Sequence, residues 1–152
     1  MDTGKSLRRG QSGVTLLELM IVLVIIAIIA SFAYPSYQQY IVNTKRTAAT
    51  STLLRVADRQ QQFFMDNKRY AADLTTLGFT ASPLFIADDG TSVEAGDADS
   101  TYVIGLANVT AISYTATAAP LGAQLERDTD CGTMTLDHSG AREALNGGDD
   151  CW

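Results

Sequence analysis

The carboxylate of Glu18 is the group in this sequence that most needs a chemical explanation, because it stands inside an apolar run. Residues 14–30 read VTLLELMIVLVIIAIIA. A carboxylate inside an apolar span costs roughly 2.5–3.5 kcal/mol on insertion scales, and such a residue normally has a partner and a function. A backbone cut after Gly13 would give Val14 a free ammonium group, four residues from Glu18. That ammonium could neutralise the carboxylate, within one chain or between neighbouring chains.

The apolar run predicts an element that lies in a membrane. With residues 31–33 it reaches about twenty residues, which as a helix span a hydrocarbon core roughly 30 Å thick. Basic residues within the first nine positions precede it, so its N-terminal end is expected on the cytoplasmic side. Three interpretations fit this pattern: a signal anchor, a secretory signal peptide cut before Tyr34, or a segment cut after Gly13 that keeps Glu18.

Residues 13–22, GVTLLELMIV, resemble the prepilin signature of type IV pilins and type II secretion pseudopilins. The resemblance implies that prepilin peptidase cuts between Gly13 and Val14 and N-methylates Val14, where the family usually has phenylalanine. It also implies that Glu18, the fifth mature residue, pairs with the N-terminal amine of an adjacent subunit and sets the register of a filament. Pro35 matches the family's proline late in the membrane segment and is expected to kink or locally melt the helix.

The resemblance divides the chain into three parts and places them in the cell. Residues 1–13 are expected to be a leader peptide, residues 14–35 a transmembrane and filament-core helix, and residues 36–152 a globular head. Before assembly the subunit would be a single-pass inner-membrane protein with its head in the periplasm. After assembly it would belong to an extracellular pilus. The expected partners are the membrane, other pilin subunits, prepilin peptidase and the inner-membrane assembly machinery.

A helical pattern continues beyond Pro35 to about residue 65. Its apolar residues recur mostly at helical spacing and include Ile41, Ala48, Leu53, Leu54, Val56, Ala57, Phe63 and Phe64. Polar residues fill the intervals, so this half is predicted to be amphipathic, with one apolar stripe against the head. Residues 67–79 are expected to end the helix and to form a loop that apolar side chains hold on the core.

Alternating side chains predict a sheet in the second half of the chain. The expected strands are residues 101–107, 111–118 and 133–137, with a weaker one at 121–127. In the second strand, Ile112, Tyr114 and Ala116 would share a face. Consecutive strands with short connections imply an antiparallel sheet with one face on the helix. The predicted fold class is α+β: a long N-terminal helix, half transmembrane and half amphipathic, packed on an antiparallel sheet of about four strands.

Cys131 and Cys151 are the two cysteines of the chain, and in an exported protein they predict one disulfide. The bond would close a C-terminal loop that has little apolar pattern of its own, and would stabilise it by roughly 3 kcal/mol. A C-terminal loop bounded by a disulfide resembles the variable region of type IV pilins, whereas major pseudopilins usually lack it. Residues 115–120 and 130–136 and the Cys151-Trp152 ending resemble PilE-like minor pilins most.

No group of residues predicts catalysis. His138, the single histidine, stands between Asp137 and Ser139, and adjacent residues of an extended chain cannot converge as a catalytic triad. Five acids lie within residues 88–100. They could attract calcium, but their spacing lacks the full EF-hand pattern. We expect no enzyme activity, no metal and no cofactor.

The charge of the chain argues against a nucleic-acid partner. The formal net charge is −6, and removal of a leader that carries +2 leaves −8. A body this acidic does not attract DNA by long-range electrostatics, although Lys68, Arg69, Arg127 and Arg142 could form a local basic surface. The expected function is a structural subunit of a type IV pilus, a pilin or minor pilin. It would support pilus biogenesis and twitching motility, adhesion or DNA uptake. A type II secretion pseudopilin and a DNA-uptake receptor pilin are the alternatives.

Overall fold

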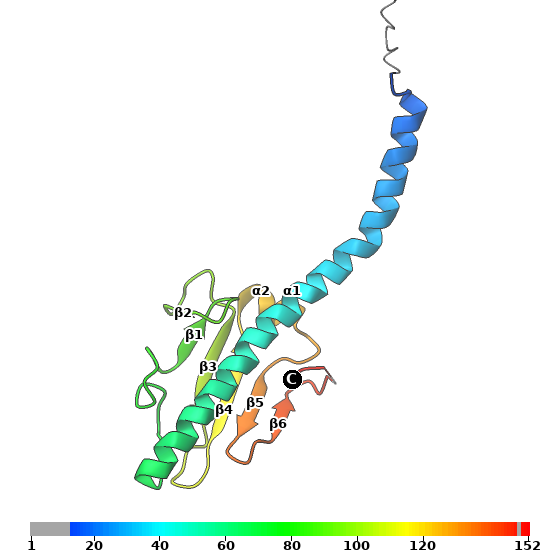
Figure 1. Ribbon diagram of the computed structural model, residues 1–152. Helices are drawn as coiled ribbons and strands as arrows, with labels where there is room; N and C mark the ends of the chain where they lie inside the picture. Colours follow the sequence, from blue (N-terminus) through cyan, green and yellow to red (C-terminus); the bar gives the residue numbers. More distant parts are fainter. Residues whose placement is uncertain (1–12, 149) are drawn as a thin grey trace, which may run out of the picture. The chain divides into compact units, whose positions relative to one another are not determined.

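The protein is described by a computed structural model that covers residues 13–148 and 150–152. It consists of two compact units, an N-terminal unit that ends at Gln38 and a head, Gln39–Trp152. Except for Gly13, the expected leader lies outside the described residues. Helix α1, Leu16–Asn67, contributes to both units, as the blue-to-green ribbon in Figure 1 shows. The predicted long helix is therefore confirmed, and its bounds lie within two residues of those expected.

In the N-terminal unit, α1 is a single helix whose large apolar side chains all face solvent. It continues through Pro35 without a break, and the kink expected there stays a prediction. The helix begins at a local signal, because the Thr15 hydroxyl accepts a hydrogen bond from the Glu18 backbone N–H at 3.2 Å. Thr15 and Glu18 have the spacing of a capping box, so this glutamate also marks the start of the helix.

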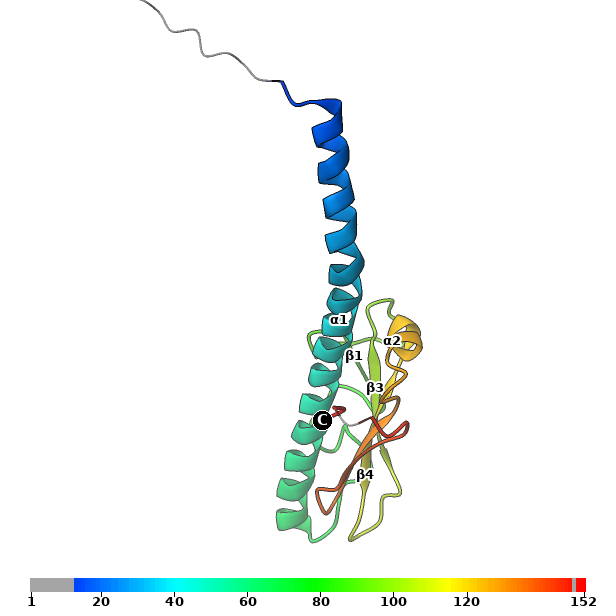
Figure 2. The same ribbon diagram turned by 90° about the vertical axis from the view of Figure 1, so that its right-hand side faces the viewer.

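The head is a six-stranded antiparallel sheet with one helix on its face. The strands are β1 (Leu84–Ile86), β2 (Ser92–Val93), β3 (Tyr102–Ala107), β4 (Thr115–Pro120), β5 (Met134–Asp137) and β6 (Arg142–Ala144). Their order is β2-β1-β3-β4-β5-β6. A short helix α2, Gly122–Arg127, follows β4. Figure 2 shows the head-forming part of α1 as one layer and the sheet as the other.

The core lies between these two layers. Leu53 and Val56 of α1 are fully buried, as the apolar stripe predicts, whereas Leu54 is 45% exposed. Alternate residues of β4 point inward, and Ala116 and Ala118 have no exposed surface. These small side chains leave room for the helix that crosses the sheet. Beyond the end of α1, Leu74 and Leu77 are buried and hold the following loop on the core, as expected.

The fold class is confirmed, and three details of the prediction are corrected. The sheet has six strands rather than about four, because β1, β2 and β6 have only two or three residues each, too few to show alternation. Residues 121–127 form α2 instead of a weak strand. There the Leu121 carbonyl accepts hydrogen bonds from the N–H groups of Gln124 and Leu125, which closes a helical turn.

The third correction concerns Ile112, which is 74% exposed instead of sharing a buried face with Tyr114. The expected strand begins only at Thr115. The Thr110 hydroxyl accepts hydrogen bonds from the N–H groups of Ile112 and Ser113, at 3.2 and 3.0 Å. Such side-chain-to-backbone bonds compete with strand pairing, so residues 110–113 form a loop.

Candidate functional site

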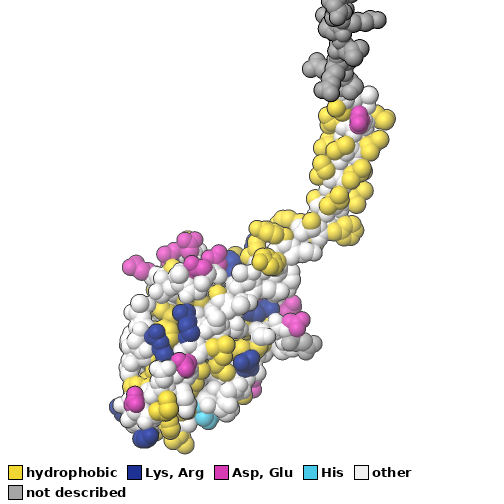
Figure 3. Space-filling model, viewed as in Figure 1, with side chains coloured by type: hydrophobic (Ala, Val, Ile, Leu, Met, Phe, Trp, Pro, Cys, Tyr) yellow, Lys and Arg dark blue, Asp and Glu magenta, His cyan; other side chains and the backbone are white. Residues whose placement is uncertain are grey.

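The first candidate site is the apolar surface of the N-terminal unit. The large apolar side chains from Leu16 to Phe32 are between 48% and 79% exposed. In Figure 3 they cover this segment in yellow, with one acidic side chain near its start. By length and composition, α1 is the one helix of the described residues that could cross a membrane. An exposed apolar surface of this extent marks a membrane or protein contact.

Gly13, Val14 and Glu18 lie together at the beginning of this unit. Gly13 and Val14 precede the helix, and Val14 is 70% exposed. A Cβ added to Gly13 would meet nothing within 4 Å, so packing in this chain does not require glycine there. Glu18 is exposed and lies in the first turn of α1. The predicted scissile bond is thus in an accessible, non-helical segment directly before the predicted charge pair.

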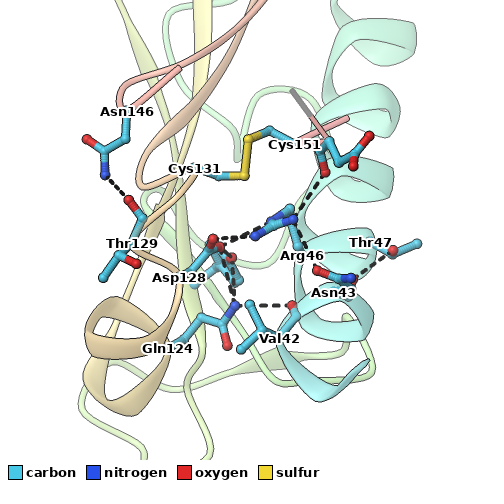
Figure 4. A network of polar contacts seen from close by, with 12 residues as sticks. Val42, Asn43, Arg46, Thr47, Gln124, Asp128, Thr129, Cys131, Asn146 and Cys151 are labelled. Atoms are coloured by element: carbon cyan, nitrogen blue, oxygen red, sulfur yellow. Dashed lines mark hydrogen bonds and ion pairs between the residues drawn. A yellow bond between two sulfur atoms is a disulfide. The ribbon is translucent and has the colours of Figure 1, made fainter. Parts of the chain in front are cut away.

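The second candidate is a buried polar network in the head (Figure 4). Arg46 of α1 forms an ion pair with Asp128, with Nη2 2.5 Å from Oδ1 and Nε 3.3 Å from Oδ2. The Tyr102 hydroxyl donates to Asp128 at 2.6 Å, and the Gln124 amide donates to the Tyr102 oxygen and to the Val42 carbonyl. The buried carboxylate of Asp128, the residue directly after α2, thus joins α1 to β3.

Burial and charge pairing set the protonation of this network. Burial raises the pKa of the Tyr102 hydroxyl well above its usual value, and its hydrogen bond to Asp128 adds to that increase. Burial alone would lower the pKa of Arg46, but the hydrogen bond and the charge of Asp128 outweigh it and raise that pKa. Tyr102 therefore stays neutral and Arg46 stays charged near neutral pH.

The buried network was not predicted from the sequence. Arg46 has the spacing of the buried residues of α1, one turn after Val42 and one before Ala49. That position was a signal for a buried charge in need of a partner. Asp128 had no such signal, because it follows a segment expected to be a strand.

The disulfide between Cys131 and Cys151 is confirmed. It holds the C-terminal segment next to the network, where Arg46 Nη1 donates to the Asp150 carbonyl at 3.1 Å. Trp152 packs against the core, and its indole N–H donates to the Glu143 carbonyl at 3.2 Å. The disulfide, the indole and Arg46 together hold a tail that contributes little apolar surface of its own.

The residues around His138 and the acidic residues 88–100 do not form a chemical site in the described structure. Asp137 accepts hydrogen bonds from the Ser139 hydroxyl and from the N–H groups of Ser139 and Ala141. These bonds lower the pKa of Asp137 and shape an exposed turn, so Ser139 is not aligned with His138. Among the residues that the structure describes, no cluster of acidic, histidine or cysteine side chains could hold a metal ion. The calcium interpretation of residues 88–100 thus has no support from geometry.

Comparison with known proteins now places the chain. A family model described as "Type IV minor pilin ComP, DNA uptake sequence receptor" matches residues 35–135, more than half of the chain. The chain belongs to this type IV minor pilin family. A second model, the prokaryotic N-terminal methylation motif, matches residues 8–34 and so includes Gly13, Val14 and Glu18 of this minor pilin.

Other comparisons are more distant. A solved type IV pilin from Shewanella oneidensis is 17% identical, covers 72% of this minor pilin and 97% of its own chain, and has a TM-score of 0.43. No curated protein sequence matches. The minor pilin family is a structural family rather than an enzyme family. The buried network of Arg46 and Asp128 joins elements of the head.

Proposed function

We propose that this minor pilin is made as a membrane-inserted precursor, cut between Gly13 and Val14, N-methylated at Val14 and built into a type IV pilus. The observation that carries the proposal is the exposed apolar surface of the helix, with a single carboxylate one turn after Val14. A membrane can cover this surface before assembly and helices of other subunits can cover it afterwards. Prepilin peptidase and the inner-membrane assembly machinery are the partners this route requires.

Glu18 would set the axial register of the assembled helices. A buried charge without a partner is costly, so a packing that pairs Glu18 with the Val14 ammonium of a neighbour is favoured over others. Exchange of Glu18 for Gln keeps the shape and removes the charge. We expect Glu18→Gln precursor to be cleaved normally, while its amount in sheared pili falls at least tenfold.

The first test is the intact mass and N-terminal sequence of the protein extracted from membranes. A chain that starts at methylated Val14 supports the proposal. A chain that starts at Tyr34 contradicts it, because Glu18 would have been discarded with a signal peptide. For the assembly step, Glu126→Gln is the matched control, since Glu126 is an exposed carboxylate of α2. Equal pilus incorporation of both variants would show that Glu18 does not direct assembly.

A type II secretion pseudopilus remains the alternative assembly. The two filaments can be separated by location, because pili are recovered from the cell surface by shearing. Quantitative mass spectrometry of sheared pili should detect this subunit at low stoichiometry, as expected of a minor pilin. Its absence from the pili, together with loss of protein secretion in a strain that lacks it, would favour the pseudopilus.

A second candidate function is DNA uptake, favoured by the description of the matching family as a DNA uptake sequence receptor. The net charge of −6 argues against long-range attraction of DNA, so binding would depend on local cations. Exposed cations that could contact phosphates include Lys68 and Arg69 directly after α1, Arg127 at the end of α2 and Arg142 on β6. Arg142 also stacks on the ring of Trp152.

Duplex binding at several salt concentrations tests this second function. With about four phosphate contacts, affinity should fall roughly a hundredfold between 50 and 200 mM salt. Lys68→Ala with Arg69→Ala should weaken binding and reduce the salt dependence. If a duplex does not bind at low salt, the proposed DNA binding is wrong. If the double variant binds as well as wild type and with the same salt dependence, Lys68 and Arg69 do not contact the DNA.

A further inference from the structure

A groove on the head lies between α1 and the β1–β2 hairpin and is separate from the assembly surface and the buried network. Its volume is about 710 Å³, within the range of small-ligand sites. At the hairpin tip, which lines the groove, a Cβ on Gly90 would lie 3.6 Å from the Cβ of Ala48. Arg59 also lines the groove and donates to the Leu77 carbonyl at 3.0 Å. Buried Leu84 contributes to its lining.

Two arginines on α1 line this groove, and neither forms an ion pair with a carboxylate of the described residues. Arg55 and Arg59 are four residues apart and so lie on the same side of the helix. Arg59 is held by the Leu77 carbonyl and by the Phe79 ring, 4.3 Å from the ring centre. Within residues 13–148 and 150–152, the one ion pair is that of Arg46 with Asp128. Both groove guanidinium groups therefore keep charge and several donors for a ligand.

A carboxylate also lines the groove, on the hairpin side. Asp89 Oδ1 accepts hydrogen bonds from the Thr91 N–H at 2.8 Å and from its hydroxyl at 2.7 Å. The other oxygen of Asp89 remains as an acceptor. A polyanion would be repelled by this carboxylate, whereas a ligand with hydroxyl donors would be favoured. The Ser92 hydroxyl adds a donor and an acceptor to the lining, and the Ser51 hydroxyl, which donates to the Ala48 carbonyl, adds an acceptor.

We propose that this groove binds an acidic saccharide, whose carboxylate pairs with Arg55 and Arg59 and whose hydroxyls donate to Asp89. The arginine pair selects one anionic group, and Asp89 disfavours further anions and favours hydroxyls. The groove is large enough for about two or three sugar rings. This site would give the head a ligand of its own, independent of how the subunit is assembled or whether it binds DNA.

The test is isothermal titration calorimetry of the full-length processed protein in non-ionic detergent micelles. The probes are a trisaccharide with one glucuronate and two glucose residues, and the neutral trisaccharide of glucose. We expect saturable binding of the glucuronate and at least tenfold weaker binding of the neutral probe. Arg55→Ala should lower glucuronate affinity at least tenfold. It should not disturb folding, because the one hydrogen bond that Arg55 makes in the structure is to Thr52 within the same helix.

Two further variants separate the proposed site from general electrostatics. Lys68→Ala removes the same charge from an exposed position outside the groove and should leave affinity unchanged. Asp89→Asn removes a negative charge, so electrostatics alone would strengthen binding, whereas loss of the acceptor should weaken it severalfold. The proposal is overturned if glucuronate does not bind, if Lys68→Ala weakens binding as much as Arg55→Ala, or if Asp89→Asn tightens it. Preferential binding of an extended zwitterionic peptide would also overturn it.

Discussion

At the scale of single residues, Asp128 has the largest structural role in the head. It accepts hydrogen bonds from Arg46, Tyr102 and Gln124, and its side chain has no exposed surface. A buried ion pair adds little net stability compared with apolar residues, but removal of one partner leaves an uncompensated buried charge. The network therefore makes the head sensitive to any change at this one position.

Asp128→Asn should lower the free energy of unfolding by about 3–5 kcal/mol, since Arg46 would keep a buried charge without a partner. The measurement is denaturant unfolding of the full chain in detergent micelles, followed by tryptophan fluorescence. Asp130→Asn is the control, because Asp130 is exposed, and it should change stability by less than about 0.5 kcal/mol. Equal stability of both variants would mean that the Arg46 charge is satisfied in another way.

At the scale of elements, the contact between α1 and β4 depends on small side chains. Ala118 is fully buried and is paired with Ile104 on one side and Met134 on the other. Ala119 is the next residue, on the opposite face and half-buried. Because inward and outward positions alternate along a strand, the two alanines have different neighbours despite identical chemistry.

Ala118→Leu should destabilise the head by about 1–3 kcal/mol, because the added carbons have no space between sheet and helix. Ala119→Leu places the same side chain on the other face and should be nearly neutral. Thermal unfolding by circular dichroism compares the two. A stable Ala118→Leu variant would show that the layers can separate without loss of packing.

A second element-scale prediction concerns the C-terminal tail. Cys131 and Cys151 are 20 residues apart, and replacement of both by Ser should cost about 3 kcal/mol through the greater freedom of the unfolded chain. It should also release the Asp150 carbonyl from Arg46. Denaturant unfolding of the double variant should match that of reduced wild-type protein. If the variant is as stable as the oxidised wild type, the tail is held without the disulfide.

At the scale of the whole molecule, buried tyrosines make stability depend on pH in the alkaline range. Burial raises the pKa of Tyr114 to about 12 and raises that of Tyr102 as well. In the unfolded chain a tyrosine ionises near pH 10. The unfolded state therefore loses these protons first, so stability is unaffected below about pH 10 and falls as pH rises further.

Tyrosine ionisation should therefore leave the melting temperature unchanged up to about pH 9 and lower it between about pH 10 and 12. Tyr114→Phe should reduce this decrease, because it removes one of the hydroxyls that ionise. The ring can still pack, and within the described part of the chain the Tyr114 hydroxyl has no hydrogen bond to lose. Circular dichroism melts at a series of pH values provide the measurement. An identical alkaline decrease in wild type and Tyr114→Phe would exclude Tyr114 as a contributor.

Much of this minor pilin was predictable from local sequence. The apolar run, Glu18 and the residues around Gly13 specify the N-terminal segment, because hydrophobicity, charge and chain cleavage act on neighbouring residues. The stripe with Leu53 and Val56 specifies the helix, and alternation specifies the strands that are long enough to show it, β3 and β5. A pair of cysteines in an exported chain specifies a disulfide without reference to the fold.

Only the tertiary structure decided which distant polar residues meet. Arg46 and Asp128 are 82 residues apart, and no local pattern selects one as the partner of the other. The short strands β1, β2 and β6 exist because longer neighbours pair with them, and α2 replaced an expected strand because its Gln124 side chain bonds within the core. The groove of Arg55, Arg59 and Asp89 likewise forms only because the hairpin tip packs on α1, a contact between segments that are not neighbours in sequence.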